Sequence, residues 1–339
     1  DNLNLLQVLH QGGITVDSLR TLDIGRFYGF LRKAASENRI RIIRFWGETG
    51  LTVDDVIESG SLSSAADDGH LDIIRYFVDE MGLTVEDVRD SEALQSAAWS
   101  EHLDIIRYFV EMGMTLEDVR ASGALESAAG SGSFEIIRYF VEMGMTVEDV
   151  RASEALQKAA WGGNLDIIRY FVDMGLTVED VRTSEALQEA TRGRDLDVIR
   201  YFVDMGLTVE DVRASLALRF AAEGGHLDII RYFVEMGLTV EDVRTSEALR
   251  YAIWDGRLDV IRYLVEMGLT MEDVRASNAL QFAARNGRLD VIRYLVEMGL
   301  TVEDVRASNA LRFAAERGYL NIIRYLVDRM GLTLEDMKA

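Results

Sequence analysis

Residues 165–182, with the sequence LDIIRYFVDMGLTVEDVR, recur along the chain at a fixed spacing. Counterparts of Leu165 follow at intervals of 31 residues, at Leu196, Leu227, Leu258, Leu289 and Leu320. The central motif, Ile-Ile-Arg or Val-Ile-Arg, occurs ten times, at Arg44, Arg75, Arg107, Arg138, Arg169, Arg200, Arg231, Arg262, Arg293 and Arg324. A fixed period of about 20 to 50 residues indicates a solenoid, in which each unit buries its apolar face against its neighbours. The spacing therefore predicts one continuous array with an extended surface.

The period has small faults near both ends of the chain. Residues 78–82 hold one residue more than the equivalent residues 110–113, and the same insertion recurs at 327–331. Residues 3–9 resemble the second helix of an incomplete unit, so we expect Asp1 to start a fragment or a trimmed chain. We divide the solenoid into degenerate N-terminal capping units (1–50), the repeat array (51–331) and a C-terminal capping turn (332–339).

One unit, residues 153–182, shows what each repeat is expected to form. Ser153 is a favourable N-cap for a first helix over 154–160, which ends at two glycines. Asn164 is placed to cap a second helix over 165–174, whose apolar residues cover more than one side. In the connector, Thr177 precedes Asp180 by three residues, which is a variant capping box and predicts a short helical turn. The sequence therefore predicts an all-α, curved solenoid of helix pairs with helical connectors.

Two positions depart from the turn glycine that usually follows the first helix. Glu101 and Arg194 stand there instead. Residues other than glycine avoid left-handed backbone angles. We therefore expect the stack to bend locally at these two turns.

The composition limits the classes of function. The net charge of −22 belongs mainly to the repeated framework, because each unit carries four acids and two bases, and we interpret it as a solvated face. The chain has no cysteine, which excludes disulfides and thiolate metal sites and suits an intracellular, reducing compartment. Nothing resembles a signal peptide, and the apolar runs are much shorter than a membrane span. We expect neither a membrane partner nor a cofactor.

Residues 220–237, FAAEGGHLDIIRYFVEMG, resemble the helix pair of an ankyrin repeat, and residues 65–71, AADDGHL, are also close. The resemblance covers residues 22–339, with two departures. Ser-x-Ala-Leu replaces the family's Thr-Pro-Leu-His, and the helical connector is shorter than the usual β-hairpin. The resemblance implies a non-catalytic scaffold that binds a protein or peptide through the concave face of its first helices.

The positions that differ between copies are the expected contact surface. Tryptophans follow the two alanines of the first helix in three units, and aromatic residues precede the alanines in the last four units. These aromatic residues are either packed between repeats or part of the groove. Over the variable positions, residues 92–195 carry seven acids and three bases, whereas residues 216–319 carry four acids and seven arginines.

We therefore expect the C-terminal half to make the main contact, with a partner that offers acidic and aromatic or apolar anchors. Three arginines that flank the aromatic residues, Arg219, Arg250 and Arg312, are predicted to form paired hydrogen bonds to the partner's carboxylates. The candidate contact residues are Trp99, Trp161, Arg219, Phe220, Arg250, Tyr251, Trp254, Phe282, Arg285, Arg288, Arg312, Phe313 and Arg317.

Two other functions stay open. The basic, aromatic half is also compatible with nucleic-acid binding, and the acidic framework with mimicry of nucleic acid. A scaffold with no ligand would instead show no clustering of basic or aromatic residues. Three of the four histidines precede the Leu-Asp of a second helix, where a turn or capping role is expected. No catalytic or metal-binding motif is present, so we do not expect an enzyme.

Overall fold

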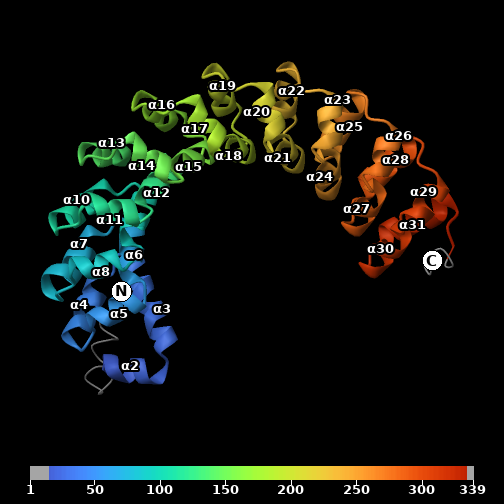
Figure 1. The fold of residues 1–339 in the computed structure, drawn as a ribbon. Coiled ribbons are helices and arrows are strands. Elements are labelled where there is room, and N and C mark those ends of the chain that lie inside the picture. The colour runs from blue at the N-terminus through green and yellow to red at the C-terminus, as the bar shows by residue number, and fades with distance from the viewer. Residues whose placement is uncertain (1–14, 334–339) are drawn as a thin grey trace. The chain divides into compact units, whose positions relative to one another are not determined.

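The computed structural model describes residues 15–333, which fall into two compact units divided between Leu176 and Thr177. The proposed incomplete helix at residues 3–9 and most of the proposed C-terminal capping turn lie outside the described residues. Within the described range every regular element is a helix and no strand is present (Figure 1). The prediction of an all-α repeat fold is confirmed, while the division into capping segments and array stays a prediction.

Each repeat contributes a connector helix, a first helix and a second helix. In unit 1 the connectors are α2 (Val16–Leu22), α5 (Val53–Glu58), α8 (Val85–Arg89), α11 (Leu116–Ala121) and α14 (Val147–Ala152). The first helices are α3 (Ile24–Ser36), α6 (Ser61–Asp67), α9 (Ala93–Trp99), α12 (Ala124–Ser131) and α15 (Ala155–Trp161). The second helices are α4 (Ile40–Glu48), α7 (Leu71–Arg75) with its continuation η1 (Tyr76–Glu80), α10 (Leu103–Glu111), α13 (Phe134–Glu142) and α16 (Leu165–Asp173).

Unit 2 repeats the same order. Its connectors are α17 (Val178–Thr183), α20 (Val209–Ala214), α23 (Val240–Thr245), α26 (Met271–Ala276) and α29 (Val302–Ala307). The first helices are α18 (Ala186–Gly193), α21 (Ala217–Gly224), α24 (Ala248–Asp255), α27 (Ala279–Arg285) and α30 (Ala310–Glu316). The second helices are α19 (Leu196–Asp204), α22 (Leu227–Glu235), α25 (Leu258–Glu266), α28 (Leu289–Glu297) and α31 (Leu320–Met330).

Inside each unit the first helices form one row and the second helices form another (Figure 1). The paired alanines of most first helices lie where neighbouring first helices meet, as Ala97 and Ala98 show by being fully buried. On α10, Ile105, Ile106 and Phe109 are also fully buried. Small residues let the first helices approach closely, and the large apolar residues of the second helices fill the space between the rows. The regular part of the sequence is therefore the core.

The helical connectors begin with the predicted capping box. In α26, Thr270 is the N-cap, and its backbone N–H and hydroxyl both donate to Oδ2 of Asp273, at 2.8 and 2.9 Å. The same aspartate accepts from Arg244 of the preceding connector, with Nε 2.9 Å from Oδ1. One carboxylate thus caps its own helix and ties two repeats together.

The structure corrects two predicted caps. Glu154, not Ser153, is the N-cap of α15, and the Ser153 hydroxyl instead accepts from the Ala155 N–H at 3.2 Å and donates to the Val150 carbonyl at 3.1 Å. Asn164 occupies the N-cap position of α16 but does not cap it with its side chain. Its amide donates to the carbonyls of Ala129 and Gly130 in the preceding repeat, at 2.8 and 2.9 Å.

Two histidines in the position of Asn164 behave in the same way. Nε2 of His70 lies 2.8 Å from the Ser36 carbonyl, and Nε2 of His102 lies 2.9 Å from the Asp67 carbonyl. The expected turn or capping role is therefore replaced by a bridge between repeats at His70 and His102. At His226, burial is the main cause of a lowered pKa, and Arg194 adds to the effect.

The two one-residue insertions are absorbed in different ways. The first becomes η1 (Tyr76–Glu80), a π-helical turn, which is a common way to accommodate an extra residue in a helix. It buries the Tyr76 side chain, and a methyl group at Gly47 would lie 1.9 Å from the tyrosine hydroxyl. The second insertion lengthens α31 to 11 residues.

At Glu101 and Arg194, where the sequence predicts local bends, the backbone keeps the usual conformation of the turn. The two residues take φ angles of 66° and 61°, in the same left-handed region as Gly225 at 77°. The turn is therefore kept, and the cost is backbone strain at a residue with a side chain.

Candidate functional site

The candidate site is the exposed side of the first helices, considered separately in the two units. Trp99 and Trp161 of unit 1 expose 48% and 46% of their surface, and Trp254 of unit 2 exposes 39%. Arg285 and Arg317 of unit 2, which come one and two positions after the paired alanines of α27 and α30, are also exposed. The residues that vary between copies therefore extend from the surface beside the buried alanines.

Three of the four aromatic residues that precede the alanines, Phe220, Tyr251 and Phe282, pack between repeats. Phe220, Tyr251 and Phe313 are half-buried, and Phe282 is buried. The Phe282 ring centre lies 5.5 Å from that of Trp254, the tryptophan of the preceding first helix. Phe282 thus offers little surface to a partner, because its neighbours already cover it.

Arginines of unit 2 lie over these aromatic rings. Cζ of Arg192 is 3.8 Å from the ring centre of Phe220, and Cζ of Arg219 is 3.9 Å from that of Tyr251. Arg250 repeats the arrangement over Phe282 at 4.7 Å. A guanidinium over an aromatic face gains cation–π attraction and shields the ring from water. These contacts link successive first helices.

The arginines expected to form paired hydrogen bonds to a partner's carboxylates are therefore already engaged. Arg219 lies over Tyr251, and its buried Nε has no hydrogen-bond partner in the described part of the chain. Arg250 pairs with Glu247 at 2.8 Å, and Arg312 lies 3.5 Å from Glu316. The sequence analysis did not predict these arginine–ring contacts. An arginine that comes 32 residues before an aromatic residue, as Arg219 does before Tyr251, would have indicated them.

Arg288 also connects two neighbouring repeats. Its Nε donates to the Trp254 carbonyl at 3.1 Å, and Nη2 lies 3.8 Å from Asp255. It occupies the position before its second helix, like Asn164 and His102, and bridges to the preceding repeat in the same manner. Its charge is thus partly compensated.

An open area of the unit 2 face lies over α27 and α30. Gln281 stands where Arg219 and Arg250 stand in their repeats, so no arginine from that position covers Phe313. The guanidinium of its neighbour Arg312 lies with Cζ 5.2 Å from the centre of the Phe313 ring. Arg285 and Arg317 make no ion pair with any residue between 15 and 333. This area combines a half-exposed aromatic ring with two uncompensated positive charges.

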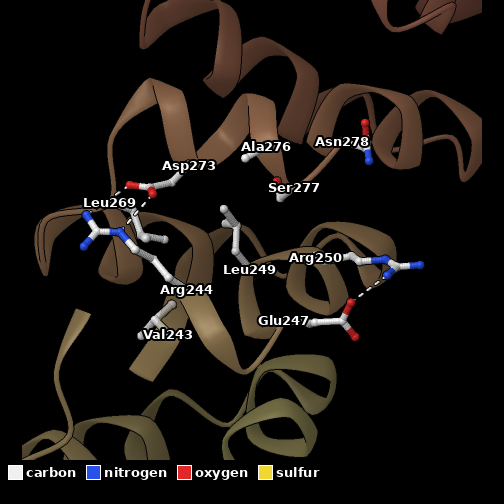
Figure 2. Close-up of a pocket in the computed structure, with 10 residues that line it drawn as sticks. All are labelled: Val243, Arg244, Glu247, Leu249, Arg250, Leu269, Asp273, Ala276, Ser277 and Asn278. Carbon is white, nitrogen blue, oxygen red and sulfur yellow. Dashed lines mark hydrogen bonds and ion pairs between the residues drawn. The ribbon is translucent and has the colours of Figure 1, made fainter. Parts of the chain in front are cut away.

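A small pocket of about 270 Å³ lies between α23, α24 and α26. Figure 2 shows Leu249 toward its centre, with Arg244 and Arg250 on two sides. Both arginines are held by ion pairs, Arg244 to Asp273 and Arg250 to Glu247 (Figure 2). The pocket is therefore part of the packing between connectors. Among residues 15–333, no cluster of histidine and acidic side chains has the arrangement of a metal site.

The helix rows define the chain as an all-α tandem-repeat solenoid. Residues 187–336 carry ankyrin repeats, because the family model "Ankyrin repeats (3 copies)" matches residues 187–275 and 269–336. The predicted resemblance is confirmed, and repeats of this family generally serve as non-catalytic scaffolds for protein–protein interaction.

Comparison with individual proteins adds little to this assignment. The crystal structure of the human ASB11 ankyrin repeat domain matches with a TM-score of 0.47 and 20% identity, covering 62% of this chain and 98% of that one. No curated protein sequence matches the chain. Within the described residues, no helix is long and apolar enough to cross a membrane.

Proposed function

We propose that this protein binds a protein or peptide through the exposed side of its first helices. The proposal rests on the different burial of the shared and the variable residues within each repeat. The alanines and large apolar residues shared by the copies are buried, whereas Trp99, Trp161, Trp254, Arg285 and Arg317 are exposed. Exposed aromatic and arginine side chains beside a rigid core are typical of energetically important contacts in protein interfaces.

The main contact is proposed to lie in unit 2, over α24, α27 and α30. Trp254, Phe313, Arg285 and Arg317 offer apolar surface and positive charge there. A partner with acidic side chains around an aromatic or apolar anchor fits this chemistry. Arg219, Phe220, Arg250, Tyr251, Phe282, Arg288 and Arg312 support the face mainly by packing and bridging between repeats.

A protein partner suits this surface better than a nucleic acid does. Several arginines of the basic half already lie over aromatic rings or face carboxylates of the same chain. They are therefore poorly placed to form a row of phosphate contacts. The absence of cysteine supports placing this binding in a reducing, intracellular compartment.

The test is capture of binding proteins by the full chain and by two variants of equal charge. The first variant carries Arg285→Glu and Arg317→Glu. The control carries Arg324→Glu and Arg329→Glu, which changes two exposed arginines of the second helix α31. Arg285 and Arg317 make no internal ion pair in the described residues, so the first variant should fold normally.

We expect the first variant to lose at least tenfold in affinity for the captured protein and the control to bind like the wild type. A photo-crosslinking residue at position 285 should also join the partner, whereas one at Glu297 on the second helix α28 should not. Equal binding by the two variants, or crosslinking only from position 297, would place the partner elsewhere.

A further inference from the structure

Unit 1 carries a second exposed aromatic surface, formed by Trp99 of α9 and Trp161 of α15. The helix between them has Gly130 at the equivalent position. A methyl group at residue 130 would lie 3.3 Å from Cζ3 of Trp99 and 3.4 Å from Cβ of Lys158. The glycine therefore lets the Trp99 indole rest against α12, while 48% of the tryptophan stays exposed.

The charge around these tryptophans is opposite to that of the open area in unit 2. Glu126 precedes Gly130 by four residues on α12, so it lies one turn away on the same side of the helix. Glu92 lies at the start of α9, and neither glutamate has an ion pair among residues 15–333. Lys158 is a base on this face, and it is already paired with Glu154 at 3.4 Å.

The aromatic rings of the two units also differ in what covers them. In unit 2, Arg192 lies 3.8 Å from the Phe220 ring and Arg219 lies 3.9 Å from the Tyr251 ring. No guanidinium or ammonium of the described residues lies over Trp99 or Trp161. Indole is the strongest cation–π acceptor among the aromatic side chains, so these two rings are unused sites for a cation.

From these observations we infer that the tryptophan surface of unit 1 accepts arginine side chains from an extended, basic peptide segment of a partner protein. One guanidinium lies over the Trp99 indole and forms a charge-assisted hydrogen bond to the Glu126 carboxylate, and a second lies over Trp161. This inference rests on the proposed function, because it takes the first-helix side as the binding side. It adds a second contact with the opposite charge preference.

The repeat geometry sets the spacing of the two arginines. Trp99 and Trp161 are two helices apart, and packed helices are separated by about 8–10 Å, so the two rings are about 20 Å apart. An extended chain advances about 3.3 Å per residue. Arginines about six residues apart should therefore reach both indoles.

The experiment uses the full chain and a 12-residue glycine–serine peptide with two arginines six residues apart. The chain has four tryptophans, so the indole N–H signals can be followed individually by NMR. We expect the arginine peptide to shift the signals of Trp99 and Trp161, while the buried Trp46 stays unchanged. A peptide with glutamate in place of arginine should shift neither.

Matched variants separate a local contact from a general effect of charge. Glu126→Gln should weaken binding of the arginine peptide by about fivefold, because it removes the charged acceptor for the guanidinium. Glu111→Gln, an exposed change of the same charge on the second helix α10, should leave it unchanged. Equal effects of the two variants, or shifts of Trp254 as large as those of Trp99, would overturn the inference.

The outcome can be separated from that of the proposed function. Loss of protein capture by the Arg285→Glu, Arg317→Glu variant, together with no response to the arginine peptide, would reject only the unit 1 site. If that variant still captures the partner and the arginine peptide shifts the two indole signals, the unit 2 contact is rejected and the unit 1 site is supported.

Discussion

Single residues keep the repeat regular even where the sequence departs from the pattern. The turn after the first helix requires a left-handed residue, and glycine supplies it in most repeats. Arg194 and Glu101 adopt the same conformation with φ angles of 61° and 66°. Their neighbours hold them there, because a change in the turn would disturb the stacking of both helices.

Replacing Arg194 with glycine should therefore stabilise unit 2 by about 1 kcal/mol, since the strain is removed and the turn is unchanged. The measurement is the midpoint and slope of urea denaturation. Gly225→Ala is the opposite control, because φ is 77° and the added methyl would lie 2.9 Å from Cδ of Arg257. Destabilisation by Arg194→Gly would show that the arginine side chain contributes more than the strain costs.

At the scale of the element, the connector helices depend on one repeated carboxylate. Hydrogen bonds from Arg244 and from Thr270 hold the pKa of Asp273 at about 2, below its ordinary value of 3.8. The pKa of Asp304 is lowered by Arg275 in the same way. Because the folded pKa is the lower one, the ionised carboxylate stabilises the fold above the unfolded value of about 3.9. This contribution is lost as the pH falls toward the folded pKa.

Asp273→Asn should accordingly lower the free energy of unfolding by about 1 kcal/mol at pH 7, where both the cap and the ion pair are weakened. Near pH 2 the difference between the variant and the wild type should largely disappear. Urea denaturation at the two pH values provides the measurement. Asp290→Asn, on the exposed side of α28, should cost less than about 0.5 kcal/mol. A constant difference at both pH values would contradict the proposed role of the charge.

The second helices show how one substitution redirects its neighbours. Most carry an arginine over the tyrosine of the next repeat, as Arg262 lies 5.4 Å from the ring centre of Tyr294. Phe134 replaces the usual leucine at the start of α13, and the Tyr170 ring packs against it at 5.3 Å. Arg138 instead faces Glu135 and Glu142, at 3.3 and 3.7 Å. The pairing thus depends on the residue that the tyrosine meets.

At the scale of the whole molecule, charge is distributed in two ways. The framework supplies most of the net charge of −22, and many framework acids pair with arginines of their own or the adjacent repeat. The charges that vary between repeats lie on the first helices, and they are acidic in unit 1 and basic in the open area of unit 2. The molecule therefore combines an acidic framework with proposed binding surfaces of both signs.

A protein partner should show a modest response to salt. Between about 50 and 200 mM salt, affinity is expected to fall by less than about tenfold, because aromatic and apolar contacts carry much of the interface. A nucleic acid bound through six to ten phosphates would lose about 1,000- to 100,000-fold over the same range. Titration of the captured partner at several salt concentrations distinguishes the two, and a steep loss would favour the nucleic-acid alternative.

The sequence by itself determined the repeat, its helices and the connector caps. These features depend on residues a few positions apart, such as Thr270 and Asp273, or on periodic apolar residues that one helix presents on one side. The exposure of Trp99 and Trp254 followed from the same periodicity.

Only the tertiary structure decided which residue each irregular side chain meets. Arg219 covers Tyr251, and Asn164 reaches the Ala129 carbonyl, because stacking brings residues about 32 to 35 positions apart into contact. Sequence spacing does not show whether such a side chain turns toward the next repeat or toward solvent. That choice depends on the distance between helices and on the partners already present, as the different surroundings of Arg138 and Arg262 demonstrate.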